Sequence, residues 1–213
     1  YFTDENVEKE KGIIGQEIMM YDDYPEWKVY LNTLEAMYHN HPIKLDITGT
    51  IETISHIDKE VLYKCYNTFY NPGNMAMVIC GDFKPDEIIE EVKKRLIPNK
   101  ANGDIRRIYP EEPETIVKEI IEQNMEVSQS LYSIGIKDKT VDKSYVVKKH
   151  VAIEILLNLI FGKSSELYQR LYKEGIIYTT PSMDYEFSDN YAHAMLSGQS
   201  KNPELVFEKF KQA

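Results

Sequence analysis

Residues 69–83 read FYNPGNMAMVICGDF, and this stretch decides the fold class. The turn residues at positions 71–73 end one helical pattern, and residues 75–80 form a short, nearly all-apolar run of strand length. Because such a run has no polar face, we expect a strand that is buried on both faces. A turn at Gly81 then leads into a helix over residues 85–96, which has a proline near its first turn. Helix, strand and helix in this order predict an α+β protein.

Upstream of this stretch, apolar residues recur at helical spacing in three segments. The first segment covers residues 6–20, and the second covers residues 27–41, where a His-Pro pair ends it. The third ends at the turn described above and begins at a cap, either Ser55 or Asp58. Residues 43–55 between the second and third segments are a turn-rich connection. Helices are therefore expected on both sides of that connection.

Residues 99–114 combine prolines, acids and two adjacent arginines without any periodicity, which is the composition of a linker. We place a domain boundary there, between one body over residues 1–98 and a second over residues 115–213. The elements expected in the second body are strands over 115–122, 127–137, 178–187 and 191–200, and helices over 143–161, 165–172 and from 202 onward. The long helix is expected to turn one apolar stripe inward, made of Val147, Val151, Ile155, Leu156 and Leu159.

Composition excludes several classes of function. The 213 residues carry a formal charge of −10, which repels a phosphate backbone, so we expect no nucleic-acid partner. No window has the apolar length of a membrane span and the first residues lack signal-peptide features, so we expect no membrane partner. Cys65 and Cys80 lie in apolar settings without CxxC spacing, which favours buried free thiols and a reducing compartment, the cytoplasm. Because the chain begins at Tyr1 and stops inside a helical pattern, we expect a piece of a longer protein.

Two carboxylates of the first predicted helix are candidates for chemistry. Glu10 and Glu17 are seven residues apart, so at about 100° per residue they return to within roughly 20° of each other on one helix face. A carboxylate on a rigid helix is a suitable third protein ligand for zinc, and a second one nearby can orient another ligand. Taken alone, the residues favour a solvated helix surface rich in glutamate over a metal or acid-base site.

The stretch EKEKGIIGQEI over residues 8–18 resembles the segment that follows the inverted zinc motif HxxEH in the insulinase and mitochondrial-processing-peptidase family of zinc metallopeptidases, peptidase M16, in its bacterial branch. The resemblance continues through the turn at residues 43–50 and through residues 69–83. It implies that Glu17 is the distal zinc ligand and Glu10 the supporting acid. It also implies the LuxS/processing-peptidase-like metallohydrolase fold, a two-layer mixed sheet with helices, here incomplete at both ends.

The same resemblance assigns roles to the predicted bodies. Residues 1–98 correspond to the C-terminal part of the catalytic, zinc-ligand domain, residues 99–114 to the linker, and residues 115–213 to the N-terminal part of a second, non-catalytic peptidase-like domain. Active members also carry an arginine and, seven residues later, a tyrosine that contacts the substrate near the transition-state oxygen. Tyr178 resembles that tyrosine, but Leu171 stands seven residues before it and Arg170 eight. The arginine is therefore either displaced by one residue or missing, and the structural alternative for Tyr178 is a half-buried aromatic residue.

The activity that the resemblance implies is metal-assisted peptide hydrolysis, in which zinc is held by two histidines and the distal glutamate. HxxEH is absent from this chain, because none of its histidines has the required spacing; they are His39, His41, His56, His150 and His193. The pair His39-Asn40-His41 offers metal ligation in principle, but the family has a turn at this point. We therefore expect zinc as the cofactor of the intact parent, and no bound zinc and no activity for this chain alone.

Three hypotheses follow for function. The first is a fragment of a zinc endopeptidase that hydrolyses unstructured peptides, with HxxEH upstream of Tyr1 in the parent. The second is a non-catalytic partner or structural subunit of the same family. The third is a peptide-binding module that adds an extended peptide to a sheet edge without metal. The expected partners are an extended peptide substrate and a homologous family chain, as a homodimer or a heterodimer.

Overall fold

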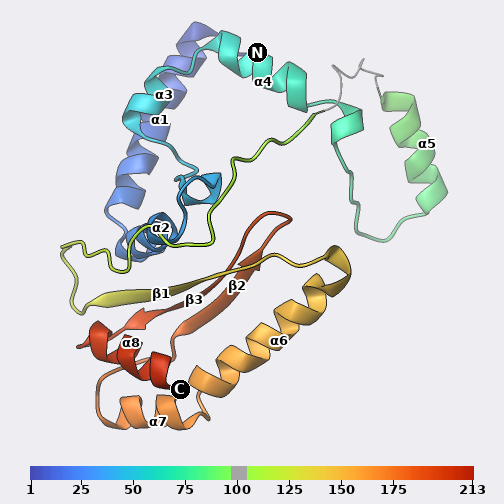
Figure 1. Ribbon diagram of the computed structural model, residues 1–213. Coiled ribbons are helices and arrows are strands. Elements are labelled where there is room, and N and C mark those ends of the chain that lie inside the picture. Colours follow the sequence, from blue (N-terminus) through green and yellow to red (C-terminus); the bar gives the residue numbers. More distant parts are fainter. Residues whose placement is uncertain (97–104) are drawn as a thin grey trace. The chain divides into compact units, whose positions relative to one another are not determined.

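A computed structural model describes residues 1–96 and 105–213 (Figure 1). The chain forms two compact units, one made of Tyr1–Gly15 with Thr50–Ile108 and the other of Gln16–Gly49 with Tyr109–Ala213. Helix α1 (Asp4–Asp22) begins in the first unit and ends in the second. Each unit therefore combines two separate stretches of the chain, whereas each predicted domain is a single continuous stretch. The predicted domain division stays a prediction. Residues 99–104 of its predicted linker lie outside the described residues.

The second unit is built on a three-stranded antiparallel sheet. Its strands are β1 (Leu131–Asp138), β2 (Ser182–Phe187) and β3 (Ala192–Gln199), in the spatial order β1-β3-β2. Met195 of β3 stands opposite Gly135 of β1 on one side and Asp184 of β2 on the other. The α+β class is therefore confirmed. Within the described residues the sheet is antiparallel, whereas the resemblance implied a mixed sheet.

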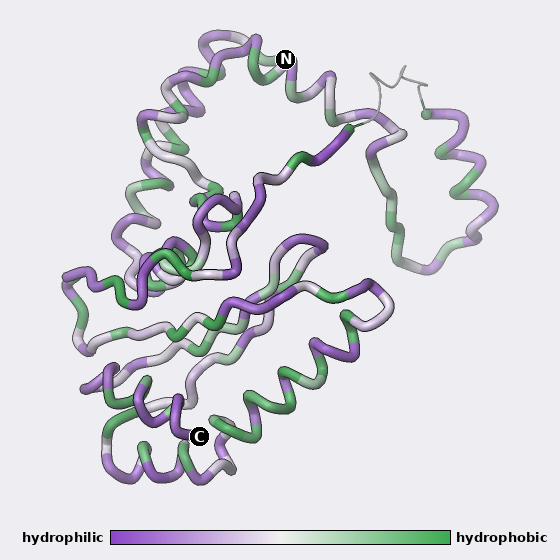
Figure 2. The backbone as a smooth tube through the Cα atoms, viewed as in Figure 1, coloured by the Kyte–Doolittle hydropathy of each residue, from purple (hydrophilic) through white to green (hydrophobic). Residues whose placement is uncertain are grey.

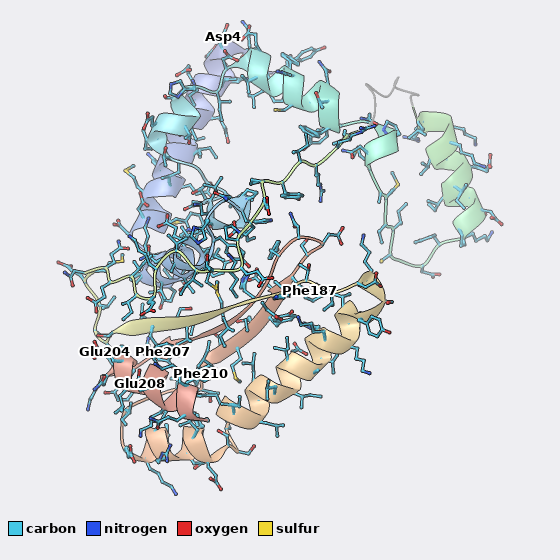
Figure 3. The ribbon with its side chains drawn as sticks, in the orientation of Figure 1. Asp4, Phe187, Glu204, Phe207, Glu208 and Phe210 are labelled. Carbon is cyan, nitrogen blue, oxygen red and sulfur yellow. The ribbon has the colours of Figure 1, made fainter. Side chains whose placement is uncertain are left out.

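Helices cover both faces of this sheet (Figure 1). On one face lie α6 (Lys143–Phe161), α7 (Glu166–Lys173) and α8 (Pro203–Gln212), and on the other lies α2 (Pro25–Met37). The main core is on the α6 side, where Phe210 of α8 packs with Phe161, their ring centroids 6.2 Å apart (Figure 3). The buried members of that core are Tyr132, Ile134, Phe161, Leu167, Tyr168, Leu171, Ile177, Leu196 and Val206.

Local signals account for most helix boundaries. Asp58 caps α4 (Lys59–Phe69) by accepting a hydrogen bond from the Val61 N–H at 2.8 Å, which selects it over Ser55 as the cap. Helix α6 spans residues 143–161 as predicted and ends at Gly162. Residues 43–55 are more ordered than predicted, because a 3-10 turn, η1 (Pro42–Lys44), and a short helix, α3 (Ile51–Ser55), form within them. Thr50 and Thr53 form a reciprocal capping box that starts α3.

The inward face predicted for α6 is wrong. Val147, Val151, Ile155, Leu156 and Leu159 are all exposed, and the residues that contact the core are Leu157 and Phe161, with Ile153 and Ile160 partly buried. Figure 2 shows hydrophobic residues on much of this helix rather than on one stripe. Periodicity cannot select an inward face on a helix that is apolar all round.

Two predicted strands are absent from the described sheet. Residues 75–80 follow the 3-10 turn η2 (Pro72–Asn74) as an extended, exposed segment in the first unit, and helix α5 (Pro85–Arg95) comes after it. Residues 115–122 are also irregular, and the N–H groups of Val117 and Lys118 both donate to the Ala36 carbonyl at the end of α2. A strand requires a partner strand, and within the described residues neither segment has one.

The cysteines are free thiols as expected, but both are exposed, which contradicts their predicted burial. Cys80 is exposed because it belongs to the unpaired segment 75–80, and Cys65 because its helix α4 has no fully buried residue. Across the parts of the chain that the structure describes, no helix combines the length and the apolar composition that a bilayer span requires.

Candidate functional site

Glu10 and Glu17 lie on one exposed face of helix α1. The buried side of this helix carries Val7 and Ile18, whereas Glu10, Ile13, Glu17 and Met20 form an exposed stripe at helical spacing. Among the described residues, neither carboxylate forms a hydrogen bond or an ion pair. The two carboxylates therefore share a face of α1, as predicted. Their roles in a zinc site stay predictions.

Local chemistry sets the position of this helix. The Thr3 hydroxyl accepts a hydrogen bond from the Asn6 N–H at 3.2 Å, so the helix begins slightly earlier than predicted. Lys11 pairs with Glu8 at 2.7 Å. A Cβ at Gly15 would stand 3.3 Å from Ile51 Cδ1, so the missing side chain allows α3 to approach α1 closely.

The described residues do not assemble a metal site by themselves. Within residues 1–96 and 105–213, no three His, Cys, Asp or Glu side chains are grouped so that they could hold a metal ion. Glu17 presents a free carboxylate on a rigid helix, which fits one ligand of a catalytic zinc site, and such a site takes three protein ligands. The other two would have to come from outside this chain.

The histidine pair at positions 39 and 41 is used structurally. His39 Nε2 lies 3.3 Å from the Thr115 hydroxyl, and His41 Nδ1 accepts a hydrogen bond from the Ile43 N–H at 3.0 Å. The two imidazoles thus bond to different segments.

Tyr178 lies between α7 and β2. Its hydroxyl is buried without a hydrogen-bond partner among the described residues, and the Lys201 ammonium stands 5.6 Å from its ring centroid. Leu171, seven residues earlier, is fully buried in the core, and Arg170 is exposed on α7. A core leucine, Leu171, therefore occupies the position at which the resemblance places an arginine in active family members.

Sequence reasoning missed a polar row on the α2 side of the sheet that is centred on a buried histidine. Lys137, His193 and Glu186 stand directly opposite one another on β1, β3 and β2. His193 is fully buried, its Nδ1 lies 2.9 Å from the Tyr38 hydroxyl, and its Nε2 lies 3.8 Å from Glu186 Oε2. The Tyr38 hydroxyl also lies 3.2 Å from the Ala192 carbonyl, and His193 Nε2 has no hydrogen-bond partner among the described residues.

Burial shifts the titration of this row. It lowers the pKa of His193 from 6.5 to about 4, and the nearby His41 adds to that shift. Burial and the charge of Asp184 raise the pKa of Glu186. No spacing rule would have found this row, because its members come from three strands and meet only through register.

A second missed cluster lies in the stretch predicted to be a linker. The Glu112 carboxylate accepts hydrogen bonds from the backbone N–H groups of residues 39, 40 and 41, and from the Lys137 ammonium at 2.5 Å. Burial by itself raises the pKa of Glu112, but these hydrogen bonds outweigh it and lower the pKa to about 2. Lys137 also donates to the carbonyls of Met37, Pro113 and Thr115, so the cluster joins the end of α2 to β1.

Comparison with known proteins links these features to a family. The model of the family described as "Peptidase M16 inactive domain" matches residues 56–212. The uncharacterized zinc protease YmfH of Bacillus subtilis is 40% identical over 212 residues, which are 98% of this chain and 50% of that protein. The chain spans about half the length of the first curated relatives it matches.

Solved structures agree over the whole chain. An M16-like peptidase from Alicyclobacillus acidocaldarius is 39% identical, with a TM-score of 0.90, and the match covers 100% of this chain and 51% of that one. A protease from Helicobacter pylori has a TM-score of 0.82 and covers 100% of this chain and 52% of its own. At 18% identity, the second similarity shows the fold alone.

Proposed function

The chain belongs to the peptidase M16 family, and from this premise we propose that it is part of a zinc-dependent metalloendopeptidase of the insulinase and processing-peptidase type. The complete enzyme hydrolyses peptide bonds of unstructured peptides, and this chain is inactive by itself. The observation that carries the proposal is the exposed, unpaired carboxylate of Glu17 on helix α1, with Glu10 on the same face.

Zinc, when bound, supplies a Lewis acid that lowers the pKa of a water molecule. In this proposal Glu17 contributes one oxygen ligand, and its exposed face leaves it free to meet two histidines from the part of the protein outside this chain. Glu10 holds a neighbouring ligand in orientation through a hydrogen bond. Tyr178 stays the proposed substrate contact by resemblance alone, because its hydroxyl, although unpaired among the described residues, is buried in this chain.

The proposal includes the rest of the protein. The similarity to structures about twice as long supports a LuxS/processing-peptidase-like fold in which this chain is incomplete, with residues 1–98 in the zinc-ligand domain and residues 115–213 in the second domain. An extended peptide is the substrate, and a homologous chain, identical or not, is the partner. Two free thiols support a reducing compartment such as the cytoplasm.

The experiment joins this chain to the half of the Bacillus subtilis relative that it does not cover and measures zinc content and cleavage of an unstructured peptide. Glu17→Gln should remove most of the bound zinc and lower the cleavage rate at least ~100-fold, because the zinc site loses a ligand. Glu5→Gln, an exposed glutamate on the same helix, is the matched control and should change neither quantity. Full zinc occupancy in Glu17→Gln would contradict the proposal.

A non-catalytic subunit is the second candidate. It is favoured by the match to a family model described as inactive and by Leu171 at the arginine position. In that case the joined protein would fold without binding zinc, and Glu17→Gln would have no effect. A metal-free peptide-binding module would instead bind an extended peptide with the same affinity in the presence and in the absence of EDTA.

A further inference from the structure

Two carboxylates on strand β2 lack a positive partner. Glu186 and Asp184 are two residues apart on this strand, so their side chains lie on the same face of the sheet. That face is the α2 side, because Asp184 stands opposite Met195, which packs with Leu34 of α2. The Glu186 side chain is 39% exposed and Asp184 is exposed. Among the described residues, neither carboxylate forms an ion pair with a lysine or an arginine, so β2 presents two uncompensated negative charges.

The two basic residues in register with Glu186 do not supply a counter-charge. Lys137 stands two strands away, about 10 Å at the usual strand spacing, and its ammonium is bound by Glu112 and by three carbonyls. His193 is the direct neighbour, but burial lowers its pKa to about 4, so its imidazole is neutral at pH 7. Burial and the charge of Asp184 raise the pKa of Glu186, as expected for a carboxylate without a cation beside it.

His193 also directs an unused polar atom toward Glu186. Its Nε2 lies 3.8 Å from Glu186 Oε2, which is too long for a hydrogen bond, and it is buried with no partner among the described residues. Most buried polar atoms in folded proteins have a partner, so an unpaired one indicates a water molecule or a ligand at that place. The unpaired nitrogen and the two carboxylates therefore come together on the α2 side of two neighbouring strands.

Two aromatic residues of α2 border the carboxylates. The Tyr30 hydroxyl lies 3.5 Å from Glu186 Oε1, and the Tyr30 ring stacks on Trp27 with centroids 5.4 Å apart. Both rings are partly exposed. The face of an aromatic ring attracts a cation, and the planar guanidinium of arginine stacks on it as well. Acidic and aromatic groups therefore combine here into a surface that suits a cation carried on an apolar stem.

We propose that Glu186, Asp184 and Tyr30 bind one basic side chain, an arginine or a lysine, of an extended peptide. The guanidinium or ammonium group supplies the missing counter-charge and donates hydrogen bonds to the carboxylates, while the alkyl stem lies on the Tyr30 ring. A metal ion does not fit, because within the described residues no three His, Cys, Asp or Glu side chains are grouped to hold one. The inference rests on the proposed function only in taking a peptide as the carrier of the basic group.

Peptide binding to the zinc-free chain at pH 7 tests this site. The probe is a short Gly-Ser peptide, blocked at both ends, with one central arginine. The matched neutral probe carries citrulline, which keeps the shape and removes the charge, and lysine with norleucine forms a second such pair. An NMR titration follows the indole N–H of Trp27, the one tryptophan of the chain, and the amides of β2. Each basic probe should bind at least ~10-fold more tightly than its neutral partner, and added salt should weaken that binding.

Substitutions that each remove one negative charge separate this site from the net charge of the chain. Glu186→Gln should lower the affinity for the arginine probe to that for the citrulline probe. Asp184→Asn, at an exposed position, should weaken binding at least ~3-fold without affecting the fold. Asp189→Asn is the matched control, because Asp189 already pairs with Lys143 at 3.1 Å, and it should leave the affinity unchanged. Unchanged amide shifts of α6 report that each variant remains folded.

Two results would overturn the inference. One is no binding of the basic probes, or binding no tighter than that of their neutral partners, because the site would then not recognise charge. The other is the same affinity for the arginine probe in Glu186→Gln, Asp184→Asn and Asp189→Asn, because the probe would then follow the net charge of the chain. If Glu186→Gln does not fold, Asp184→Asn against Asp189→Asn decides. None of these measurements depends on zinc or cleavage, so a charge-specific site in a protein that cleaves nothing would refute the proposed function alone.

Discussion

His193 shows how one buried residue makes stability depend on pH. Its folded-state pKa is about 4 and its unfolded value is 6.5, so the unfolded state binds the proton first as the pH falls. Stability is therefore complete above pH 6.5 and decreases between pH 6.5 and 4, by about 3 kcal/mol in total for a shift of this size. The raised pKa of the facing Glu186 opposes part of this loss, and Tyr38 and Lys137 also face the imidazole.

Urea unfolding at pH 7 and at pH 4.5 measures this dependence. His193→Gln should lower stability at pH 7, because it disturbs the bond to Tyr38, and should flatten the change between the two pH values. His56→Gln is the control, since His56 is exposed and should leave the pH dependence as in the parent chain. An unchanged slope in His193→Gln would refute the assignment.

Glu112 and Lys137 form the strongest buried pair, each with a side chain 9% exposed. Glu112→Gln should destabilise the chain by about 3 kcal/mol, because it leaves the Lys137 ammonium buried without its counter-charge. Since the folded-state pKa of Glu112 is about 2, this stabilisation is present above about pH 4.5 and is lost as the pH falls toward 2.

Chemical denaturation at pH 7 tests the pair against a nearby one. Lys139 and Glu114 are 2.7 Å apart with side chains 72% and 73% exposed, so Glu114→Gln should cost less than about 1 kcal/mol. Equal losses from the two substitutions would show that burial does not govern the Glu112 pair.

At the scale of elements, the approach of helix α2 to strand β1 depends on Gly135. A Cβ there would stand 2.7 Å from both Met37 Sδ and Thr33 Cγ2. Both partner residues are buried and Thr33 is stiff, so Gly135→Ala should destabilise by about 1–3 kcal/mol through displacement of the helix.

Thermal unfolding of a second glycine variant provides the comparison. Gly12 lies in α1 with nothing within 4 Å of its would-be Cβ, so Gly12→Ala should instead stabilise by about 0.5–1 kcal/mol. A gain at position 135 would mean that α2 and β1 adjust without strain.

At the scale of the whole molecule, the proposed function gives this chain one carboxylate, Glu17, of a zinc site that needs three protein ligands. We therefore predict that the isolated chain binds no stoichiometric zinc and cleaves no peptide. Metal analysis of the purified chain measures this. Stoichiometric zinc that Glu17→Ala abolishes would contradict the prediction, because the remaining ligands would then come from this chain.

The sequence by itself determined the features that depend on neighbours along the chain. It predicted both ends of helix α6 correctly, and it predicted the hairpin of β2 and β3. It also named Asp58 as one of two possible caps of α4, and it predicted a helix on which Glu10 and Glu17 share a face. Helical spacing and caps involve residues within about four positions of one another, so they can be read from a short window. The family resemblance at residues 8–18 is equally local and agrees with the family match.

Only the tertiary structure decided the features that depend on partners distant in sequence. It showed that residues 75–80 are unpaired, that α6 buries Leu157 and Phe161 instead of the predicted stripe, and that both cysteines are exposed. It also brought His193 into line with Glu186 through strand register, and Glu112 to the end of α2. Burial and strand pairing each depend on two segments that are distant in the sequence. The residues of one segment do not show which other segment will pack against it or pair with it.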